Sequence, residues 1–229
     1  MNSGAFPFDP STVDVLLVSH AHLDHVGRIP LLVKNGFCGP VYAHRATVEL
    51  AEIVLHDSAH IQETEAVWLT RKRQRLGLSP AQPLYTKSDA QAALSYFQGV
   101  GYGERVELGE GLSFTFHDAG HILGSATVEL VASGKTVVYS GDLGQRGHPI
   151  IRDPEQVETA DWLLLESTYG DRLHPVREDV REELAAAVEM AVGHRGKLII
   201  PAFAVERTQE ILYELSLLLA SKRIPKIPV

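Results

Sequence analysis

The stretch Ser19-His20-Ala21-His22-Leu23-Asp24-His25 decides how this sequence is interpreted. It ends a short apolar, β-branched run that predicts a buried strand. Alternate residues of an extended segment point the same way, so His20 and His22 can share one ion. The turn that follows brings Asp24 and His25 round to a second ion. Imidazole nitrogen and carboxylate oxygen suit zinc, and an exposed polar loop has no reason to concentrate such ligands.

Two further candidate ligands each follow a predicted strand. His121 lies in Gly120-His121-Ile122-Leu123-Gly124-Ser125, and Asp142 lies in Ser140-Gly141-Asp142. The neighbouring glycines allow the tight turns that would bring both side chains close to a metal. Alone, each pattern is more typical of a turn. Beside the first array they complete a two-metal ligand set, in which Asp142 is the candidate bridge between ions about 3.5–4 Å apart.

Composition and charge restrict the class of protein. The chain has 229 residues, of which 45% are hydrophobic and 22% charged, as in ordinary globular proteins. Its formal net charge of −8 argues against coating nucleic acid by bulk charge, but not against contact at one local site. We expect no membrane span, because no run of 18 apolar residues occurs. The single cysteine, Cys38, and an N-terminus unlike a secretory signal predict a cytoplasmic protein without a cysteine zinc site.

The pattern of apolar residues predicts a layered α/β protein. A β-meander precedes a strand-helix-strand-helix order, and the apolar run at 162–165 predicts a buried strand. We expect the apolar face of the last helix to lack a partner. The predicted strands cover 13–19, 41–43, 104–108, 112–116, 126–131, 136–139, 162–165 and 197–200, and the predicted helices cover 46–76, 88–97, 177–192 and 205–219.

These motifs together resemble the metallo-β-lactamase superfamily. Glu166-Ser167-Thr168-Tyr169-Gly170 and the stretch from Ile200 to Glu210 are similar to its β-CASP branch. The stretch His56-Asp57-Ser58-Ala59-His60-Ile61-Gln62 is similar to bacterial and archaeal members. The resemblance implies a partial αββα sandwich. Residues 1–196 would form the metallo-β-lactamase core, and residues 197–229 would begin a truncated β-CASP domain. The chain would then be a fragment of a longer protein.

The resemblance also implies a cofactor and a role for each motif residue. Two Zn²⁺ ions are expected, one on His20, His22 and His121. The other would lie on Asp24 and His25, with Asp142 bridging both. The catalytic residues would be Asp24, Asp142 and Glu166. Glu166 would support a general-acid histidine expected beyond residue 229.

The implied activity is the hydrolysis of RNA phosphodiester bonds by a metal-activated hydroxide. The expected partner is single-stranded RNA, and a homo-oligomer of the longer protein stays open. One alternative is a small-molecule thioester or lactone hydrolase on the same fold, which would not need the E-S-T-Y-G stretch. Another is a non-catalytic scaffold subunit, a class that loses metal ligands, whereas all six expected here are present. DNA as a substrate, and endonuclease or 5′ exonuclease action, also stay open.

The dense basic run Arg71-Lys72-Arg73-Gln74-Arg75 has two interpretations. It can be a solvated helix end, where cations complement the helix dipole. It can also be a rim beside the metal site, where Arg71, Lys72, Arg73 and Arg75 contact RNA phosphates.

Overall fold

The computed structural model describes residues 4–173 and 177–229, with side chains left out at 177–179. The chain forms two compact units, Met1–Glu166 and Ser167–Val229. The domain boundary expected at residue 196 stays a prediction. Among the described residues, none of the helices has the length and apolarity of a membrane span.

The first sheet is parallel and three-stranded. Its order is β1-β2-β3, with Leu16 opposite Val41 and Val41 opposite Phe97. Parallel neighbours need crossover connections, and here helices supply them. The strands are β1 (Leu16–Val18), β2 (Val41–His44) and β3 (Phe97–Val100). A 3-10 turn, η1 (Pro10–Thr12), precedes them, and the crossover helices are α1 (Leu23–Val26), α2 (Ile29–Lys34), α3 (Arg45–Gln74) and α4 (Lys87–Leu94).

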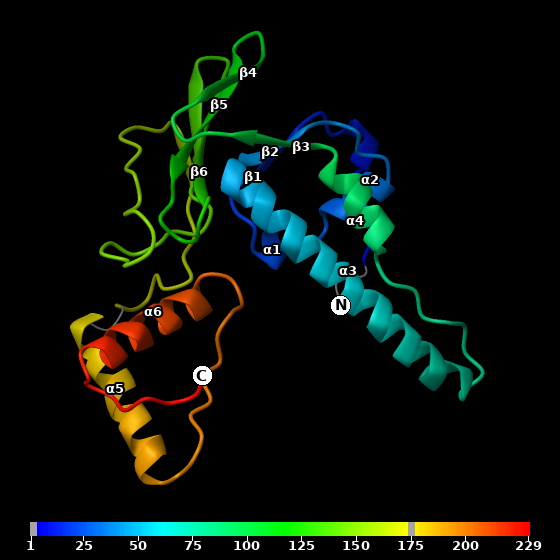
Figure 1. Cartoon of the computed structure of the whole chain (residues 1–229). Helices are drawn as coiled ribbons and strands as arrows, with labels where there is room; N and C mark the ends of the chain where they lie inside the picture. Colours follow the sequence, from blue (N-terminus) through cyan, green and yellow to red (C-terminus); the bar gives the residue numbers. More distant parts are fainter. Residues whose placement is uncertain (1–3, 174–176) are drawn as a thin grey trace. The chain divides into compact units, whose positions relative to one another are not determined.

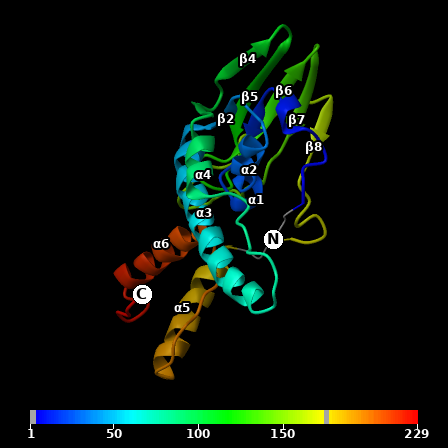
Figure 2. The ribbon, with the colours of Figure 1, turned by 90° about the vertical axis from the view of Figure 1, so that its right-hand side faces the viewer.

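The second sheet has five strands and confirms the predicted meander. Strands β4 to β7 pair antiparallel in sequence order, and β8 joins β7 in parallel at the edge. Figure 2 shows β5 to β8 side by side. The strands are β4 (Arg105–Gly109), β5 (Leu112–Asp118), β6 (Ala126–Ala132), β7 (Lys135–Tyr139) and β8 (Trp162–Leu164).

The first unit is layered, with helices, the parallel sheet and the meander sheet in that order. Strand β2 shows the layering, since Val41 and Ala43 belong to the core formed with the helices. Tyr42, on the other face, packs into a second core with Phe114 and Phe116 of the meander. Alternate strand residues thus face different layers. These layers account for three of the four in the expected sandwich, and the fold class is confirmed as a partial one.

Helix α3 is longer than the core it covers. Its buried residues include Ala51, Leu55 and Ala59, and the last of them is Ala66. The remaining turns, to Gln74, contain no buried residue. Figure 1 shows the C-terminal end of α3 running on past the strands of the parallel sheet. The tertiary packing therefore holds the helix only as far as Ala66.

Three local predictions are wrong. Helix α4 stops at Leu94, its capping box is built by Thr86 and Asp89, and Phe97 begins β3 instead. Residues 197–200 form no strand. The run 162–165 is exposed rather than buried, with Trp162 at 67% exposure, because no other described layer covers either face of the edge strand β8.

The second unit consists mainly of α5 (Arg177–Gly193) and α6 (Arg207–Ala220). Leu215 and Leu218 of α6 pack with Ala185 and Val188 of α5. The apolar face of the last helix therefore has a partner, contrary to expectation. The ion pair between Arg181 and Glu214 also joins the two helices.

Candidate metal centre

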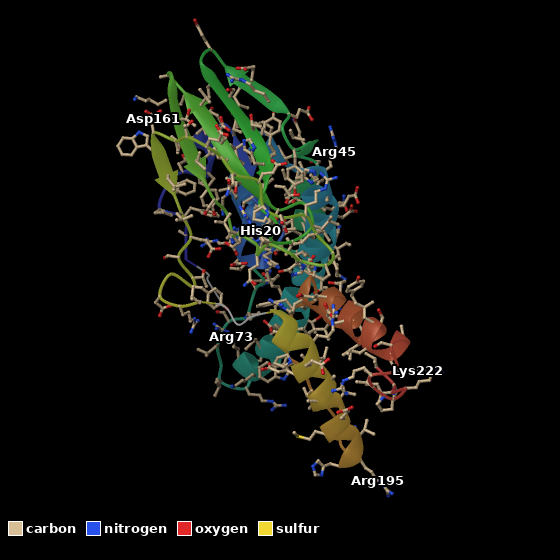
Figure 3. All side chains as sticks on the ribbon, turned by 90° about the vertical axis from the view of Figure 1, so that its left-hand side faces the viewer. His20, Arg45, Arg73, Asp161, Arg195 and Lys222 are labelled. Atoms are coloured by element: carbon tan, nitrogen blue, oxygen red, sulfur yellow. The ribbon has the colours of Figure 1, made fainter. Side chains whose placement is uncertain are left out.

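The predicted ligands come from the ends of strands in both sheets. His20 follows β1, and His22 is the residue before α1. His121 follows β5, and Asp142 follows β7. Figure 3 shows His20 within the layered unit, and its side chain is completely buried. Three segments that are distant in the sequence thus meet at one place.

Three histidine rings converge on one point. The Nδ1 atom of His22 lies 3.1 Å from Nε2 of His20 and 3.1 Å from Nε2 of His121. A ring nitrogen offers one hydrogen or one lone pair, so Nδ1 of His22 cannot hydrogen-bond both neighbours at once. Ligand atoms of His20, His22, His121 and Asp142 all lie within 4.8 Å of one another. A shared cation explains this convergence better than hydrogen bonding does.

Asp142 turns its two oxygens toward different histidines. Its Oδ2 lies 3.7 Å from Nε2 of both His20 and His121. Its Oδ1 lies 3.5 Å from Nε2 of His25, and the same nitrogen is 3.7 Å from Oδ2 of Asp24. The carboxylate of Asp142 therefore lies between the group formed by three histidines and the pair formed by Asp24 and His25.

The separations between ligand atoms fit zinc coordination. Bonds of about 2.0–2.1 Å to nitrogen and oxygen put tetrahedral ligand atoms about 3.3–3.4 Å apart. The nitrogen–nitrogen separations of 3.1 Å and the nitrogen–oxygen separations of 3.5–3.7 Å bracket this edge length. Both the donor set and its spacing are thus suited to zinc.

Burial keeps the clustered imidazoles neutral. Burial, helped by nearby His25, His121 and His22, lowers the pKa of His20 to about 2. Burial is also the main cause of the lowered pKa values of His22 and His121. A metal needs the neutral imidazole, so the three rings are in the ligand form at neutral pH.

Ser19 lies within hydrogen-bonding distance of two of the histidines. It is buried, and its Oγ lies 3.1 Å from Nδ1 of His20 and 3.3 Å from Nδ1 of His25. A serine oxygen can accept two hydrogen bonds. If both Nδ1 atoms donate to it, both Nε2 lone pairs face Asp142. This role of Ser19 was not predicted from the sequence, although Ser19 directly precedes His20.

Short polar side chains and glycines fix the loop that carries His121. The Ser125 hydroxyl accepts hydrogen bonds from the backbone amides of His121 and Ile122. Thr47 of α3, also buried, donates to the carbonyl of Gly124 at 2.6 Å. Gly144 packs so closely that an added Cβ would lie 1.5 Å from the carbonyl oxygen of Gly120. The G-H-x-x-G-S spacing was the available signal for Ser125.

Glu166 lies beside the loop that carries Asp142. Its Oε1 accepts a hydrogen bond from the amide of Leu143 at 2.8 Å, and its own amide donates to Oγ of Ser140 at 3.0 Å. Its negative charge raises the pKa of His121, against the larger lowering that burial causes. Glu166 therefore braces the residues on both sides of Gly141-Asp142. The expected role with a histidine beyond residue 229 stays a prediction.

The basic run does not form a rim beside the metal centre. Thr47, which bonds the His121 loop, lies near the start of α3, whereas Arg71 comes 24 residues later. At about 1.5 Å per residue the helix separates them by about 36 Å. Figure 3 shows Arg73 well away from His20. The basic run was predicted to lie beside the metal centre, but the length of α3 separates the two.

Comparison with known proteins agrees with this architecture. A family model described as the metallo-beta-lactamase superfamily domain matches residues 9–155, which contain the whole histidine and aspartate cluster. The chain belongs to the metallo-β-lactamase superfamily. The resemblance inferred from the sequence is confirmed at that level.

Several curated relatives have names that concern RNA. The chain is 44% identical over 229 residues to Ribonuclease TTHA0252 of Thermus thermophilus, covering 100% of this chain and 48% of that protein. It is 30% identical over 232 residues to an RNase J-like protein of Methanocaldococcus jannaschii, covering 100% and 49%. It is 31% identical over 202 residues to cleavage and polyadenylation specificity factor 73 of Drosophila melanogaster, covering 87% and 27%. The chain spans about half the length of the first two relatives and 27% of the length of the third.

Proposed function

We propose that this chain carries the metal centre of a zinc-dependent ribonuclease of the β-CASP type, acting on single-stranded RNA in the cytoplasm. The observation that carries the proposal is the position of Asp142 between the three-histidine group and the pair Asp24–His25. The similarity to proteins named as ribonucleases supports RNA as the substrate. The E-S-T-Y-G stretch, which a small-molecule hydrolase would not need, also favours RNA.

The proposed ligand roles follow the geometry of the cluster. His20, His22 and His121 would hold one zinc ion, Asp24 and His25 the other, and Asp142 both. Two bound zinc ions would lower the pKa of water and stabilise negative charge on the phosphoryl oxygens. The chain's own contribution is to keep the imidazoles of His20, His22 and His121 neutral by burial. Ser19 would fix the ring orientations of His20 and His25.

The two carboxylates outside the histidine group have different surroundings and different proposed tasks. Asp24 is 79% exposed, so it can reach both a ligand position and an incoming substrate. We assign it the orientation of the attacking water, a role that Asp142 shares. Glu166 holds the amide of Leu143, which keeps the Asp142 loop in place while charge develops. A strongly held ligand loop is what electrostatic preorganisation requires.

The test is metal-dependent cleavage of a labelled single-stranded RNA by the purified protein. We expect about two zinc ions per chain, loss of cleavage in a chelator and recovery on adding zinc. A lactone, a thioester and a single-stranded DNA of the same sequence serve as substrate controls. Undiminished RNA cleavage without bound metal would contradict the proposal, and efficient lactone or thioester hydrolysis without RNA cleavage would replace it with the small-molecule alternative.

A further inference from the structure

The last turns of α3, with the C-cap residue Arg75, present an aromatic and basic stripe. Trp68, Arg71, Lys72 and Arg75 are spaced at i, i+3, i+4 and i+7, which places them on one helix face. All four are exposed, and the Trp68 ring has 62% of its surface accessible. We call these four residues the α3 stripe. It lies beyond the last buried residue of the helix, Ala66, so the core does not require it.

The cations of the stripe are unpaired within the described residues. Four exposed cations elsewhere in the unit have carboxylate partners, in the pairs Lys34–Asp89, Arg45–Glu104, Arg105–Glu107 and Lys135–Asp161. No such ion pair involves Arg71, Lys72 or Arg75 in the part of the chain that the structure describes. Arg73, on another face, donates to the carbonyl of Ser79. In a chain with a net charge of −8, this concentrates unpaired positive charge at one place.

The helix dipole alone does not account for the stripe. Cations in a last turn do complement the dipole. That effect gives no reason for an exposed indole one turn earlier. Nζ of Lys72 lies 5.7 Å from the centre of the Trp68 ring, so the cation and the ring form one continuous surface. Aromatic rings beside lysine and arginine are the usual platform for single-stranded nucleic acid.

We propose that the α3 stripe binds single-stranded RNA at a distance from the metal centre. Trp68 stacks against a base, and Arg71, Lys72 and Arg75 contact phosphates. The proposal rests on the proposed ribonuclease function, because it assigns part of that substrate to a second surface. Stacking tolerates any base and phosphates carry no sequence, so the stripe adds affinity without sequence preference.

The length of α3 makes the proposal quantitative. Trp68 lies 21 residues after Thr47, whose hydroxyl bonds the His121 loop. At about 1.5 Å per residue this is about 30 Å along the helix. A stacked strand advances about 3.4 Å per nucleotide, so about nine nucleotides bridge the two places, and fewer do so if the strand is extended. The stripe should therefore matter only for RNAs long enough to reach it.

The experiment compares two RNA lengths on the purified, zinc-loaded protein. The probes are single-stranded oligonucleotides of about 4 and about 20 nucleotides, the shorter one unable to span the distance above. The variants are Trp68→Ala and the double variant Arg71→Gln with Lys72→Gln. The matched control, Arg105→Gln with Lys135→Gln, removes the same charge from paired residues of the meander sheet. Zinc content is measured for every variant.

We expect affinity for the long RNA to fall about 5- to 10-fold in Trp68→Ala, from the loss of one stacked base. In the double variant the slope of log affinity against log salt should become shallower by about 1.4, since each lost phosphate contact removes about 0.7. The control should change neither quantity in this way. Binding and cleavage of the short RNA should be unchanged in all variants, as should the zinc content.

Two outcomes would overturn the proposal that the α3 stripe binds RNA. One is unchanged long-RNA affinity and salt slope, and the other is an equal loss of affinity for both lengths. If the stripe variants bound anionic vesicles less well while RNA binding stayed the same, the surface would be reassigned to membranes. Failure of the ribonuclease function is distinguishable, because it would remove cleavage of both RNAs by the unmodified protein, whatever the stripe binds.

Discussion

The histidine cluster and the α3 stripe are opposite in almost every physical property, although one helix connects them. In the cluster His20 is buried and the other ligands are partly buried, neighbouring rings lie within hydrogen-bonding distance, and burial keeps His20 neutral. The stripe is exposed, permanently charged and without carboxylate partners among the described residues. Thr47 ties the start of α3 to the His121 loop, and the stripe lies near the other end.

The cluster and the stripe place their polar groups in two different electrostatic environments. A partly buried, closely packed set of ligands is restrained before any ion arrives, so little reorganisation remains when the ion binds. Exposed cations gain little from any one contact and are screened by salt, so they contribute as a group and at low ionic strength. We therefore expect changes in the cluster to affect metal binding and turnover, and changes in the stripe to affect affinity and its salt dependence.

The sharpest test of the buried side is Asp142→Asn compared with Asp118→Asn. Asp142 faces both groups of histidines, whereas Oδ1 of Asp118 accepts a hydrogen bond from the amide of Gly120. We expect Asp142→Asn to lower kcat for RNA cleavage by at least about 100-fold, more than the loss of a residue that only supports a ligand. Asp118→Asn keeps an acceptor for Gly120 and should retain most activity. Equal rates for the two variants would refute the bridging assignment.

A smaller effect is expected from Ser19→Ala. Loss of the hydroxyl behind His20 and His25 should weaken zinc binding about 10- to 100-fold, as measured by competition with a chromogenic chelator. Ser19→Thr keeps the hydroxyl and should restore most of the affinity. Ser113→Ala is the matched control, because Ser113 is equally buried but lies in β5. If the two alanine variants bound zinc equally well, the positioning role of Ser19 would be wrong.

Much of the fold could be predicted from the local pattern of apolar residues. The errors fall where tertiary packing, rather than local sequence, determines the secondary structure or the burial. The meander and helix α3 follow from periodicity and were predicted to within a few residues. Strand β3 was missed because its four residues, Phe97-Gln98-Gly99-Val100, carry little strand signal, and parallel pairing with β2 creates it. Residues 162–165 are apolar yet exposed, since an apolar run cannot specify whether another layer covers a sheet edge.

The candidate site also contains residues that local motifs suggest and residues that only tertiary contacts reveal. The proposed ligands each lie in a short motif near a strand end, which is why the sequence suggests them, and the structure brings His20, His22, His121 and Asp142 together. Ser19, Ser125 and Thr47 act through contacts with loops or rings, and the contact of Thr47 with Gly124 spans 77 positions of sequence. The basic run was assigned to the wrong place because a linear motif carries no distance. Only the length of α3 shows that Arg71 lies far from His121.

The smallest predicted effect concerns a paired counterpart of the stripe, the ion pair between Lys34 and Asp89. The Lys34 ammonium, followed by the backbone amide of Thr86, holds the pKa of Asp89 below its usual value. A lowered pKa in the folded state means stability that is present above the carboxyl's unfolded pKa and is lost as pH falls through the folded value. Asp89 also closes the capping box of α4. We therefore expect Asp89→Asn to lower the free energy of unfolding by about 1 kcal/mol at neutral pH.

The measurement is urea unfolding of both proteins at a series of pH values from neutral to strongly acidic. The difference between them should shrink as the carboxyl of Asp89 becomes protonated, because the pair with Lys34 is then lost in the unmodified protein too. Arg71→Gln, which removes a cation that has no ion-pair partner among the described residues, should change the free energy of unfolding by less than about 0.5 kcal/mol at every pH. A difference for Asp89→Asn that did not depend on pH would assign its effect to the geometry of the cap alone. A large effect of Arg71→Gln would mean that the stripe stabilises the fold, and it would break the contrast between the two ends of α3.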